Sequence, residues 1–338
     1  MTTTGQVRRL ALQDAPAIPG LEARFFGGVS DYALLSELTV EANQFDRIPY
    51  LPSARDLQVE MEAADGLDPV DDVVFVEVDG RLCAATGVQR VVRDGVPTYD
   101  IWGTVDPGYR RRGLATALWG WTLERARVRA AHQDLGADVA LGSFVDEGEI
   151  GHRALMVKAG FAPVRHFFLM RRLGLDDVPD APLPDGIELR PVREDQWRTI
   201  LDAENEAFRD HWGHREMGES DFRATFGRPD LDTGLWVVAW AGDEVAGVVQ
   251  NWIWPLENER LGVKRGWLEH ISVRRPWRRR GLGRAITAAA LVRLREAGLE
   301  EGMLGVDSEN ANGALGLYEG LGFAVESRAA AYRRPLMP

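Results

Sequence analysis

The chain has 338 residues and a formal net charge of −12 at pH 7, with 45% apolar and 27% charged residues. This composition excludes a wholly disordered chain, and the length predicts about two globular domains. The single cysteine, Cys83, excludes an internal disulfide and a cysteine-rich zinc site.

The first half of the chain predicts a mixture of strands and helices. In chain order these are a strand at 6–12, a hairpin of strands 73–78 and 82–92, a strand 99–105, a helix 114–130, a strand 139–144, and a last helix before a closing strand. Asp79-Gly80 between the hairpin strands is typical of a two-residue turn.

The second half predicts the same order. Its elements are a strand at 187–192, a helix 194–209, a hairpin of strands 235–241 and 245–253, a strand 267–273, a helix 282–296, a strand 303–306, and again a last helix and closing strand. Each half therefore predicts a mixed α/β domain with a mostly antiparallel sheet flanked by helices.

The two halves also repeat their sequence motifs. Residues 105–115 align without a gap with residues 273–283, and Lys158-Ala-Gly-Phe161 aligns with Gly320-Leu-Gly-Phe323. Residues 173–186 between the copies hold three prolines and four aspartates, which favour turns and extended chain. We therefore expect a first domain at 1–172, a linker at 173–186 and a second domain at 187–338.

The segment Arg278-Arg-Arg-Gly281-Leu-Gly283 links a predicted strand to the start of a predicted helix. The first N–H groups of a helix lack intrahelical partners and lie at its positive end, so such a loop suits a phosphate. A solvated face, a simple turn or a nucleic-acid patch are the alternatives for a single arginine run. Two aligned copies favour a phosphate site over these alternatives.

The pattern Arg-x-x-Gly-x-Gly/Ala after a strand resembles the pyrophosphate loop of the GNAT acyltransferase superfamily. The stretch from Asp307 to Phe323 is similar to the family's second block, Asn…Ala…Leu-Tyr…Gly-Phe. The resemblance covers nearly the whole chain as a tandem pair, and it implies two GNAT-like domains that bind acetyl-CoA or another acyl-CoA. It implies cofactor contacts in the second copy from Ile271, Ser272, Val273, Arg278, Arg279, Arg280, Gly281, Leu282, Gly283, Arg284 and Asn310.

The resemblance also implies an acid and a base for acetyl transfer to an amine. Tyr318 matches the family tyrosine that protonates the departing thiolate, since a phenol stays protonated at neutral pH. The alternative for Tyr318 is a packed residue on an apolar helix face. For the base, Glu269 and His270 are rival candidates, because the family glutamate usually stands at the position held here by Trp267.

The acceptor wall of the family follows the first helix of the domain, which in this chain is a polar and aromatic stretch. The predicted acceptor contacts are Asp210, His211, Trp212, His214, Trp252 and Trp254. The spacing of the two histidines could instead suit a metal, but no cysteine or third histidine is near, so we expect no metal.

The first copy departs from the family at the catalytic position, where Met156 aligns with Tyr318. A thioether cannot donate a proton, so we expect this half to be catalytically silent. It keeps the loop and can still bind CoA through Val105, Arg110, Arg111, Arg112, Gly113, Leu114 and Ala115.

The leading expectation is an acetyl-CoA-dependent N-acetyltransferase acting on a primary amine of a small molecule. A protein N-acetyltransferase and a non-catalytic acyl-CoA sensor or scaffold are the alternatives. The acidic charge argues against nucleic acid as a partner, and no apolar run approaches the roughly 20 residues of a membrane helix. The first residues lack a signal-sequence pattern, so we expect a cytoplasmic protein, either a monomer or a homodimer.

Overall fold

The computed structural model describes residues 7–93, 95–133, 138–228, 231–310 and 313–337. It has a mixed α/β architecture that divides into two compact units. The N-terminal unit contains Met1–Val164 and Ala330–Pro338, and the C-terminal unit contains Arg165–Ala329. Residue 6, where the sequence predicts the first strand to begin, lies outside the described residues.

The N-terminal unit is built on one mostly antiparallel sheet. Its strands are β1 (Arg9–Leu10), β2 (Leu21–Phe25), β3 (Val73–Val78), β4 (Arg81–Arg93), β5 (Val96–Val105) and β6 (Ala140–Asp146), adjacent in that order. Only the β5–β6 pair within this run is parallel.

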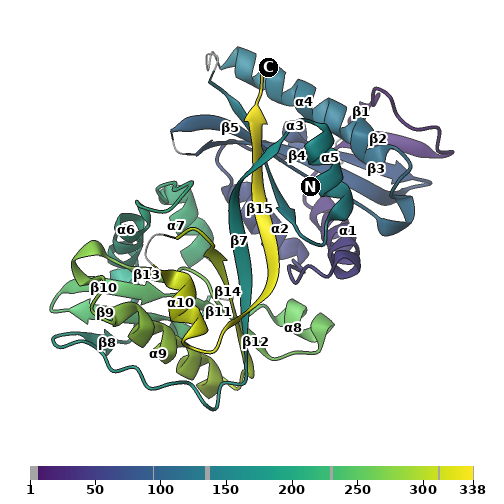
Figure 1. Ribbon diagram of the computed structural model, residues 1–338. Helices are drawn as coiled ribbons and strands as arrows, with labels where there is room; N and C mark the ends of the chain where they lie inside the picture. The colour runs from purple at the N-terminus through teal and green to yellow at the C-terminus, as the bar shows by residue number, and fades with distance from the viewer. Residues whose placement is uncertain (1–6, 94, 134–137, 229–230, 311–312, 338) are drawn as a thin grey trace, which may run out of the picture. The chain divides into compact units, whose positions relative to one another are not determined.

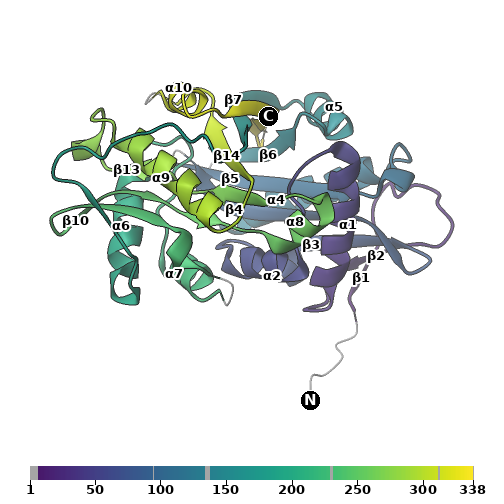
Figure 2. The same ribbon diagram turned by 90° about the horizontal axis from the view of Figure 1, so that it is seen from below.

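Helices cover both faces of this sheet because the side chains of β3 alternate between them. Val73 and Phe75 pack against helices α1 (Asp31–Asp46) and α2 (Ala54–Ala63), which lie together on one face (Figure 1). Figure 2 views the fold from below, where these two helices lie in front of the strands. The alternate residues Val74 and Val76 pack against α4 (Leu114–His132), and α5 (Ile150–Lys158) joins a further core with α4.

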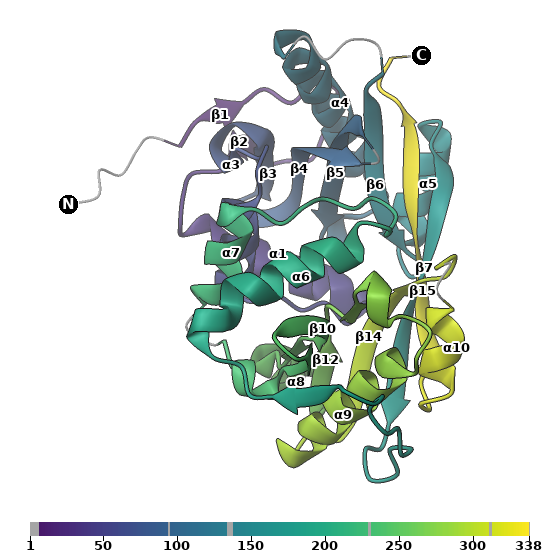
Figure 3. The ribbon, with the colours of Figure 1, turned by 90° about the vertical axis from the view of Figure 1, so that its left-hand side faces the viewer.

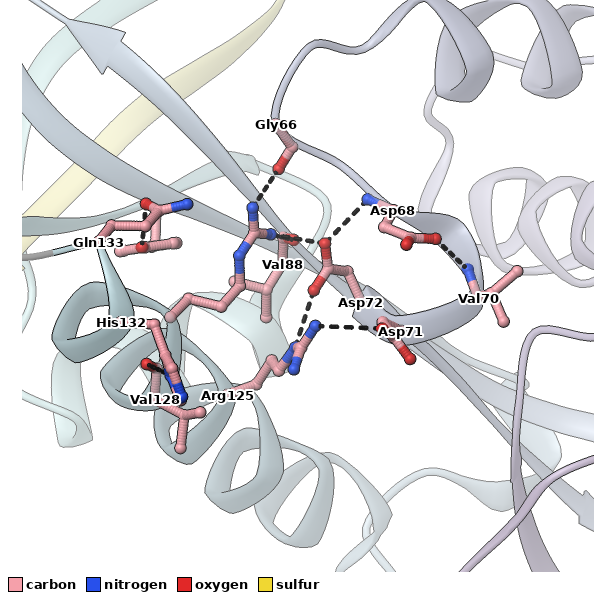
Figure 4. Close-up of polar contacts among 12 residues, drawn as sticks. Gly66, Asp68, Val70, Asp71, Asp72, Val88, Arg125, Val128, His132 and Gln133 are labelled. Atoms are coloured by element: carbon pink, nitrogen blue, oxygen red, sulfur yellow. Dashed lines mark hydrogen bonds and ion pairs between the residues drawn. The ribbon is translucent and has the colours of Figure 1, made fainter.

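A buried ion cluster fastens α4 to the short helix α3 (Pro69–Asp72). Asp72 is 1% exposed, and its carboxylate accepts hydrogen bonds from Arg125 Nε at 2.8 Å and from the backbone N–H of Asp68 at 2.9 Å (Figure 4). Arg129 Nη1 donates at 2.5 Å to Oδ2 of Asp72, the same oxygen that accepts from Asp68 N–H. Because the charge of Asp72 is fully paired, this cluster is structural rather than a site for a ligand.

The C-terminal unit has the same plan, but its strands form two sheets. One has the order β13 (Ser272–Val273), β10 (Glu244–Val249), β9 (Val237–Ala241) and β8 (Glu188–Arg190). The other contains β7 (Ala162–Leu173), β14 (Glu301–Asp307), β12 (Arg265–Leu268) and β11 (Asn251–Trp252).

Helices again cover both faces of β9 and β10. Residues of α6 (Trp197–Phe208) and α7 (Glu219–Phe226) pack with Trp236, Val238 and Trp240, while α9 (Leu282–Glu296) packs with Val237 and Ala239. Figure 3 shows β10 between α6 and α9. The unit also contains α8 (Pro255–Leu261) and α10 (Ala314–Glu319).

The strand that closes each repeat is shared between the units. From Arg165 onward, β7 belongs to the C-terminal unit, where it pairs antiparallel with β14. From Ala330 onward, β15 (Ala324–Pro335) belongs to the N-terminal unit, where Leu336 N–H donates to the Val139 carbonyl at 2.8 Å. Residues 174–187, all described, form neither helix nor strand. The contacts therefore exchange the closing strands between the repeats, a feature that the predicted boundaries do not contain.

Candidate active site

The arginine-glycine loop has the same backbone in both repeats. In the C-terminal unit it runs from a 3₁₀ turn at Arg275–Trp277 to the start of α9, with Arg279 at φ 60° and Gly281 at φ 85°. In the N-terminal unit, Arg111 has φ 63° and Gly113 has φ 94° before α4. Among the described residues no side chain caps either helix start, so its first N–H groups face outward.

The first arginine of each loop is a structural clamp. Arg278 Nε donates to the Val273 carbonyl at 2.9 Å, and Nη1 donates to Asp210 Oδ2 at 2.8 Å. Arg110 repeats this pattern in the N-terminal unit, since its Nε donates to the Val105 carbonyl at 3.0 Å and its guanidinium binds Asp46 at 2.7 and 2.8 Å. These side chains hold each loop against the end of the first long helix, so their guanidinium groups are engaged by the protein itself.

The remaining loop residues lie around the helix start. Leu282 and Leu114 are 1% exposed and anchor the helices in the core. Gly283 packs close to Leu317, where an added Cβ would lie 3.3 Å from the leucine side chain. The other predicted contacts, at least partly exposed, are Arg279, Arg280, Gly281, Arg284, Arg111, Arg112, Gly113 and Ala115.

The strand before the loop is interrupted by a one-residue bulge in the C-terminal unit. β13 pairs with β10 through Ser272 and Val248, whereas β12 pairs with β11 through Leu268 and Asn251. The register between these pairs shifts by one residue, which places an extra residue within 269–271 opposite 249–250. A bulge of this kind bends a strand and redirects a side chain.

Next to the bulge, the order of the strands leaves one edge of β13 without a neighbouring strand within the described chain. The parallel pairing of β12 with β14 ends at Trp267 and Met303. β13 continues to the loop as the edge strand of its own sheet within the described chain. Ile271, Ser272 and Val273 therefore lie where an extended ligand could pair with backbone groups.

Glu269 and His270 lie at the bulge, where part of each side chain reaches the surface while neighbouring groups surround the rest. Burial by surrounding groups raises the pKa of Glu269, against the opposing effects of His270 and a hydrogen bond from Trp254. For His270, burial alone would lower the pKa, but Glu204 and then Glu269 outweigh it, so the pKa is raised. The pair thus offers two proton acceptors with altered affinities beside the strand edge.

Glu204 on α6 is a site residue that the sequence analysis did not identify. It is 0% exposed, its Oε2 accepts a hydrogen bond from Gln250 Nε2 at 2.6 Å, and its Oε1 lies 3.6 Å from His270 Nδ1. Gln250 also accepts from the Glu269 backbone N–H through its carbonyl, at 2.9 Å. The only signal in the sequence was a glutamate at an apolar position of the helix spacing, beside Ile200 and Leu201.

Trp267, which occupies the family glutamate's usual position, is held by another buried carboxylate. Glu257 Oε1 accepts from Trp267 Nε1 at 3.0 Å and from Arg265 Nη1 at 3.2 Å. Glu257 is 4% exposed, and this burial raises the pKa of its carboxyl. Glu257 therefore supports the strand and is closed to an incoming substrate.

Aromatic side chains lie next to Glu269. The rings of Trp252 and Trp254 stack with centroids 5.7 Å apart and planes 9° apart. Trp236 packs against Trp252, and the Arg228 guanidinium lies 5.1 Å from the Trp254 ring. The pair gives a flat, rigid surface beside a carboxylate.

The predicted acceptor residues just after α6 differ in what they contact: Asp210 pairs with two arginines, and the others are half-buried. Asp210 binds both Arg275 and Arg278, and hydrogen bonds from these two arginines lower the pKa of its carboxyl. His211 packs edge-on against Phe208 at 4.4 Å, and burial lowers its pKa. Its neighbours Trp212 and His214 are half-buried, and the ring of Trp212 packs against Phe167.

Tyr318 lies on α10 and is 6% exposed. Its ring packs edge-on against Phe323 at 6.1 Å, and burial raises the pKa of its phenol. Asn310, upstream of this helix, accepts a backbone hydrogen bond from Gly313 at 3.2 Å. Because burial raises its pKa, the phenol of Tyr318 stays protonated at neutral pH.

The N-terminal unit closes the equivalent space. β4 and β5 pair without a register shift from Ala84–Val105 to Arg93–Val96, so no bulge is present in this described ladder. The parallel β5–β6 pairing ends at Asp100 and Gly142, and there Ser143 Oγ donates across to the Ile101 carbonyl at 2.9 Å.

A second set of side chains stands behind that hydrogen bond. His152 Nε2 lies 3.1 Å from Ser143 Oγ, and its Nδ1 lies 3.1 Å from Glu149 Oε1. Met156, one turn further along α5, is 2% exposed in the core.

The described chain holds no group of three metal-binding side chains. None of its described helices is long and apolar enough to cross a membrane.

Comparison with known proteins shows similarity in sequence and in fold. Residues 197–323 match the model of the acetyltransferase (GNAT) family. The chain is 33% identical over 295 residues to the mycothiol acetyltransferase of Salinispora tropica, an alignment that covers 81% of this chain and 90% of the relative. It is 28% identical to the mycothiol acetyltransferase of Kocuria rhizophila, over 85% of this chain and 96% of that one.

Two solved structures match almost the entire chain. A GCN5-related N-acetyltransferase from Sphaerobacter thermophilus has a TM-score of 0.70 at 25% identity, covering 97% of this chain and 98% of its own. A tandem GNAT protein from the clavulanic acid biosynthesis pathway has a TM-score of 0.61 at 19% identity, covering 98% and 99%. The second match bears on the fold alone, and it shares the tandem arrangement.

Proposed function

Because the chain belongs to the GNAT acetyltransferase family, we propose that its second repeat transfers an acetyl group from acetyl-CoA to a primary amine of a small molecule. The chain is an N-acetyltransferase, and members of this family use acetyl-CoA or another acyl-CoA as donor. One observation carries the finer proposal. The edge strand β13 runs into the arginine-glycine loop, and Glu269 and His270 stand at the bulge immediately before it.

The pyrophosphate of CoA would bind the backbone N–H groups of residues 279–284. The left-handed backbone at Arg279 and Gly281 turns this segment into the start of α9, whose first N–H groups are uncapped in the described chain. Arg278 supports the loop through Asp210, and Arg279 and Arg280 on the same segment are exposed, where their guanidinium groups would add hydrogen bonds to the phosphates. The pantetheine arm would pair with the free edge at Ser272 and Val273.

Acetyl transfer to an amine needs a base, an oxyanion donor and an acid. Glu269 or His270 would remove a proton from the amine, and a backbone N–H near the bulge would stabilise the oxyanion. Tyr318 would protonate the departing thiolate, since burial keeps its phenol in the protonated form. Cleavage of the C–S bond then leaves an amide and free CoA.

The acceptor would bind beside the stacked pair Trp252 and Trp254, next to the Glu269 carboxylate. A cationic amine is attracted both by a carboxylate and by aromatic faces. The relatives named mycothiol acetyltransferase support a small-molecule acceptor rather than a protein. His211, Trp212 and His214 are proposed to border the same space, whereas Asp210 is committed to two arginines.

The first repeat is proposed to be silent in this reaction. Met156 stands at the tyrosine position, β5 lacks the bulge, and Ser143 bridges to the strand whose edge would accept pantetheine. The loop at 110–115 retains the backbone of a phosphate site, so CoA binding there without turnover is compatible with these contacts.

Release of free thiol from acetyl-CoA over a panel of small amines and peptides tests the proposal. Turnover with small amines that falls strongly in Tyr318→Phe supports it. Turnover with peptides alone would indicate a protein N-acetyltransferase, and tight CoA binding with no thiol release on any amine would indicate a sensor. Either of those two results would overturn the small-molecule assignment.

A further inference from the structure

We infer that Glu204 is a positioning residue that makes His270, rather than Glu269, the general base. This inference rests on the proposed acetyl transfer and deepens it. It starts from a carboxylate that is completely buried and only half satisfied. A fully buried carboxylate in a core normally has all its oxygens bonded, so the unfilled oxygen needs a reason.

The unfilled oxygen faces His270. Gln250 Nε2 binds Glu204 Oε2 at 2.6 Å, which fixes the plane of the carboxylate. Oε1 has no hydrogen-bond partner in the described part of the chain, and His270 Nδ1 lies 3.6 Å from it. That distance is slightly longer than a hydrogen bond, and such contacts often shorten when a substrate binds.

This contact selects one tautomer of the imidazole. A carboxylate attracts an N–H group, so the proton of neutral His270 belongs on Nδ1, and Nε2 carries the lone pair. The side chain of His270 is 45% exposed, and Phe208 packs edge-on against its ring at 5.7 Å. The basic nitrogen is therefore presented outward by a ring that is held from behind, as in other carboxylate–histidine pairs.

The bulge explains why His270 reaches this position. Gln250 lies opposite the extra residue, with its carbonyl bound to Glu269 N–H and its side chain bound to Glu204. In the N-terminal unit the same place in an unshifted ladder holds Trp102 opposite Gly87. The inserted residue and the buried carboxylate thus occur together in the second repeat, and neither is found at that place in the first.

Glu269 has a different setting. Its carboxylate is held by Trp254 and interacts favourably with His270, whereas the buried carboxyl of Glu257 carries a like charge close to it. Glu269 therefore acts beside the base, where it attracts the cationic acceptor. A cationic acceptor first releases one proton to water through His270 Nε2, which leaves a neutral amine with a lone pair. This amine nitrogen then gives its second proton to His270 Nε2 as the N–C bond forms. The C–S bond breaks, and the sulfur takes a proton from Tyr318, which is restored from the imidazolium through water.

The test combines kinetics with a measurement on the histidine itself. For wild type, kcat/KM should rise with pH through a midpoint above the ordinary pKa of 6.5, because the pKa of His270 is raised. Glu204→Gln should lower kcat/KM by roughly 10- to 100-fold and move that midpoint to lower pH, with KM for acetyl-CoA unchanged. His270→Gln should lower kcat/KM about 10²- to 10⁴-fold and should abolish the fall of kcat/KM at low pH.

Asp202→Asn is the matched control, since it lies exposed on the same helix and should leave the profile unchanged. Nitrogen NMR of the full chain should show the proton of neutral His270 on Nδ1 in wild type, and a lower imidazole pKa in Glu204→Gln. This measurement needs no acceptor, so it separates failure of this inference from failure of the proposed function. An unshifted imidazole pKa, or an acidic limb removed by Glu269→Gln and kept in His270→Gln, would overturn it.

Discussion

Trp102 lies directly over Gly87 across the β4–β5 pair, and a Cβ added to Gly87 would come within 2.4 Å of the indole ring. The ring fills the place where the second repeat has its bulge and its histidine. The two repeats therefore share a loop and a strand order but differ in whether the strand before the loop is closed or opened.

This contact predicts that Gly87→Ala destabilises the protein. The added methyl group must displace the indole or the strand, which typically costs about 1–3 kcal/mol. Gly305→Ala is the control, because a Cβ at that strand position meets nothing within 4 Å. Denaturant unfolding of both variants measures the difference, and equal midpoints would contradict the packing described.

The paired loop glycines test which repeat binds the working CoA. Gly281 and Gly113 both have a left-handed backbone, so an alanine at either position carries a similar strain of about 1 kcal/mol. We expect Gly281→Ala to raise KM for acetyl-CoA about tenfold or more. Gly113→Ala should melt at a similarly lowered temperature but keep that KM. Loss of turnover in Gly113→Ala would show that the first repeat is not silent.

Asp210 was predicted as an acceptor contact, and its ion pairs favour a supporting role for the loop. Asp210→Asn removes the charge that holds Arg275 and Arg278. We therefore expect KM for acetyl-CoA to rise while KM for the amine stays nearly constant. Steady-state kinetics with each substrate varied in turn separates the two roles. A change confined to the amine would restore the acceptor assignment.

The sequence predicted the elements that local signals encode. The Asp79-Gly80 turn, the two Arg-Gly loops and the helices after them all lie where residue patterns indicated. These features depend on neighbours in the chain, such as a glycine that accepts a left-handed backbone or an apolar spacing that suits a helix. The tandem arrangement followed from their repetition, and the GNAT fold followed from the resemblance of the arginine-glycine loop and of the stretch from Asp307 to Phe323 to the family's motifs.

Features that depend on distant partners were not predicted. The bulge requires knowing how residues 268–273 pair with 247–251, and a single extra residue leaves the alternation almost unchanged. Glu204 reads as one position of an amphipathic helix, and its role arises only from contact with Gln250 and His270. The exchange of the closing strands is likewise invisible locally, because either unit could pair with the same strand.

Asp146 predicts a pH dependence of stability in the N-terminal unit. Burial, and then Glu149 and Glu147, raise the pKa of this carboxyl to about 6. A raised carboxyl pKa means that the folded state binds the proton more tightly, so its contribution to stability is lost as pH rises from about 4 to 6. Asp146→Asn should therefore stabilise the protein at pH 7.5 by about 2 kcal/mol or less, and not at pH 4.

Asp307 is the matched control for that change. It ends β14 as Asp146 ends β6, but it accepts hydrogen bonds from Arg165 Nε at 2.9 Å. Asp307→Asn should therefore destabilise the protein at pH 7.5. Urea unfolding of both variants at the two pH values gives the comparison, and a destabilised Asp146→Asn at pH 7.5 would contradict the stated effect of burial.

Tyr318 offers the sharpest separation of chemistry from packing. Its hydroxyl makes no hydrogen bond with the described residues, while its ring packs against Phe323. Tyr318→Phe keeps the packed ring and removes a buried hydroxyl that has no described partner, so the melting temperature should not fall. If the phenol protonates the leaving thiolate, kcat should fall about 10²-fold with little change in KM. The loss should shrink with a thioester whose thiol is more acidic, since such a leaving group needs no proton. An equal loss with both donors would assign Tyr318 to positioning rather than to proton transfer.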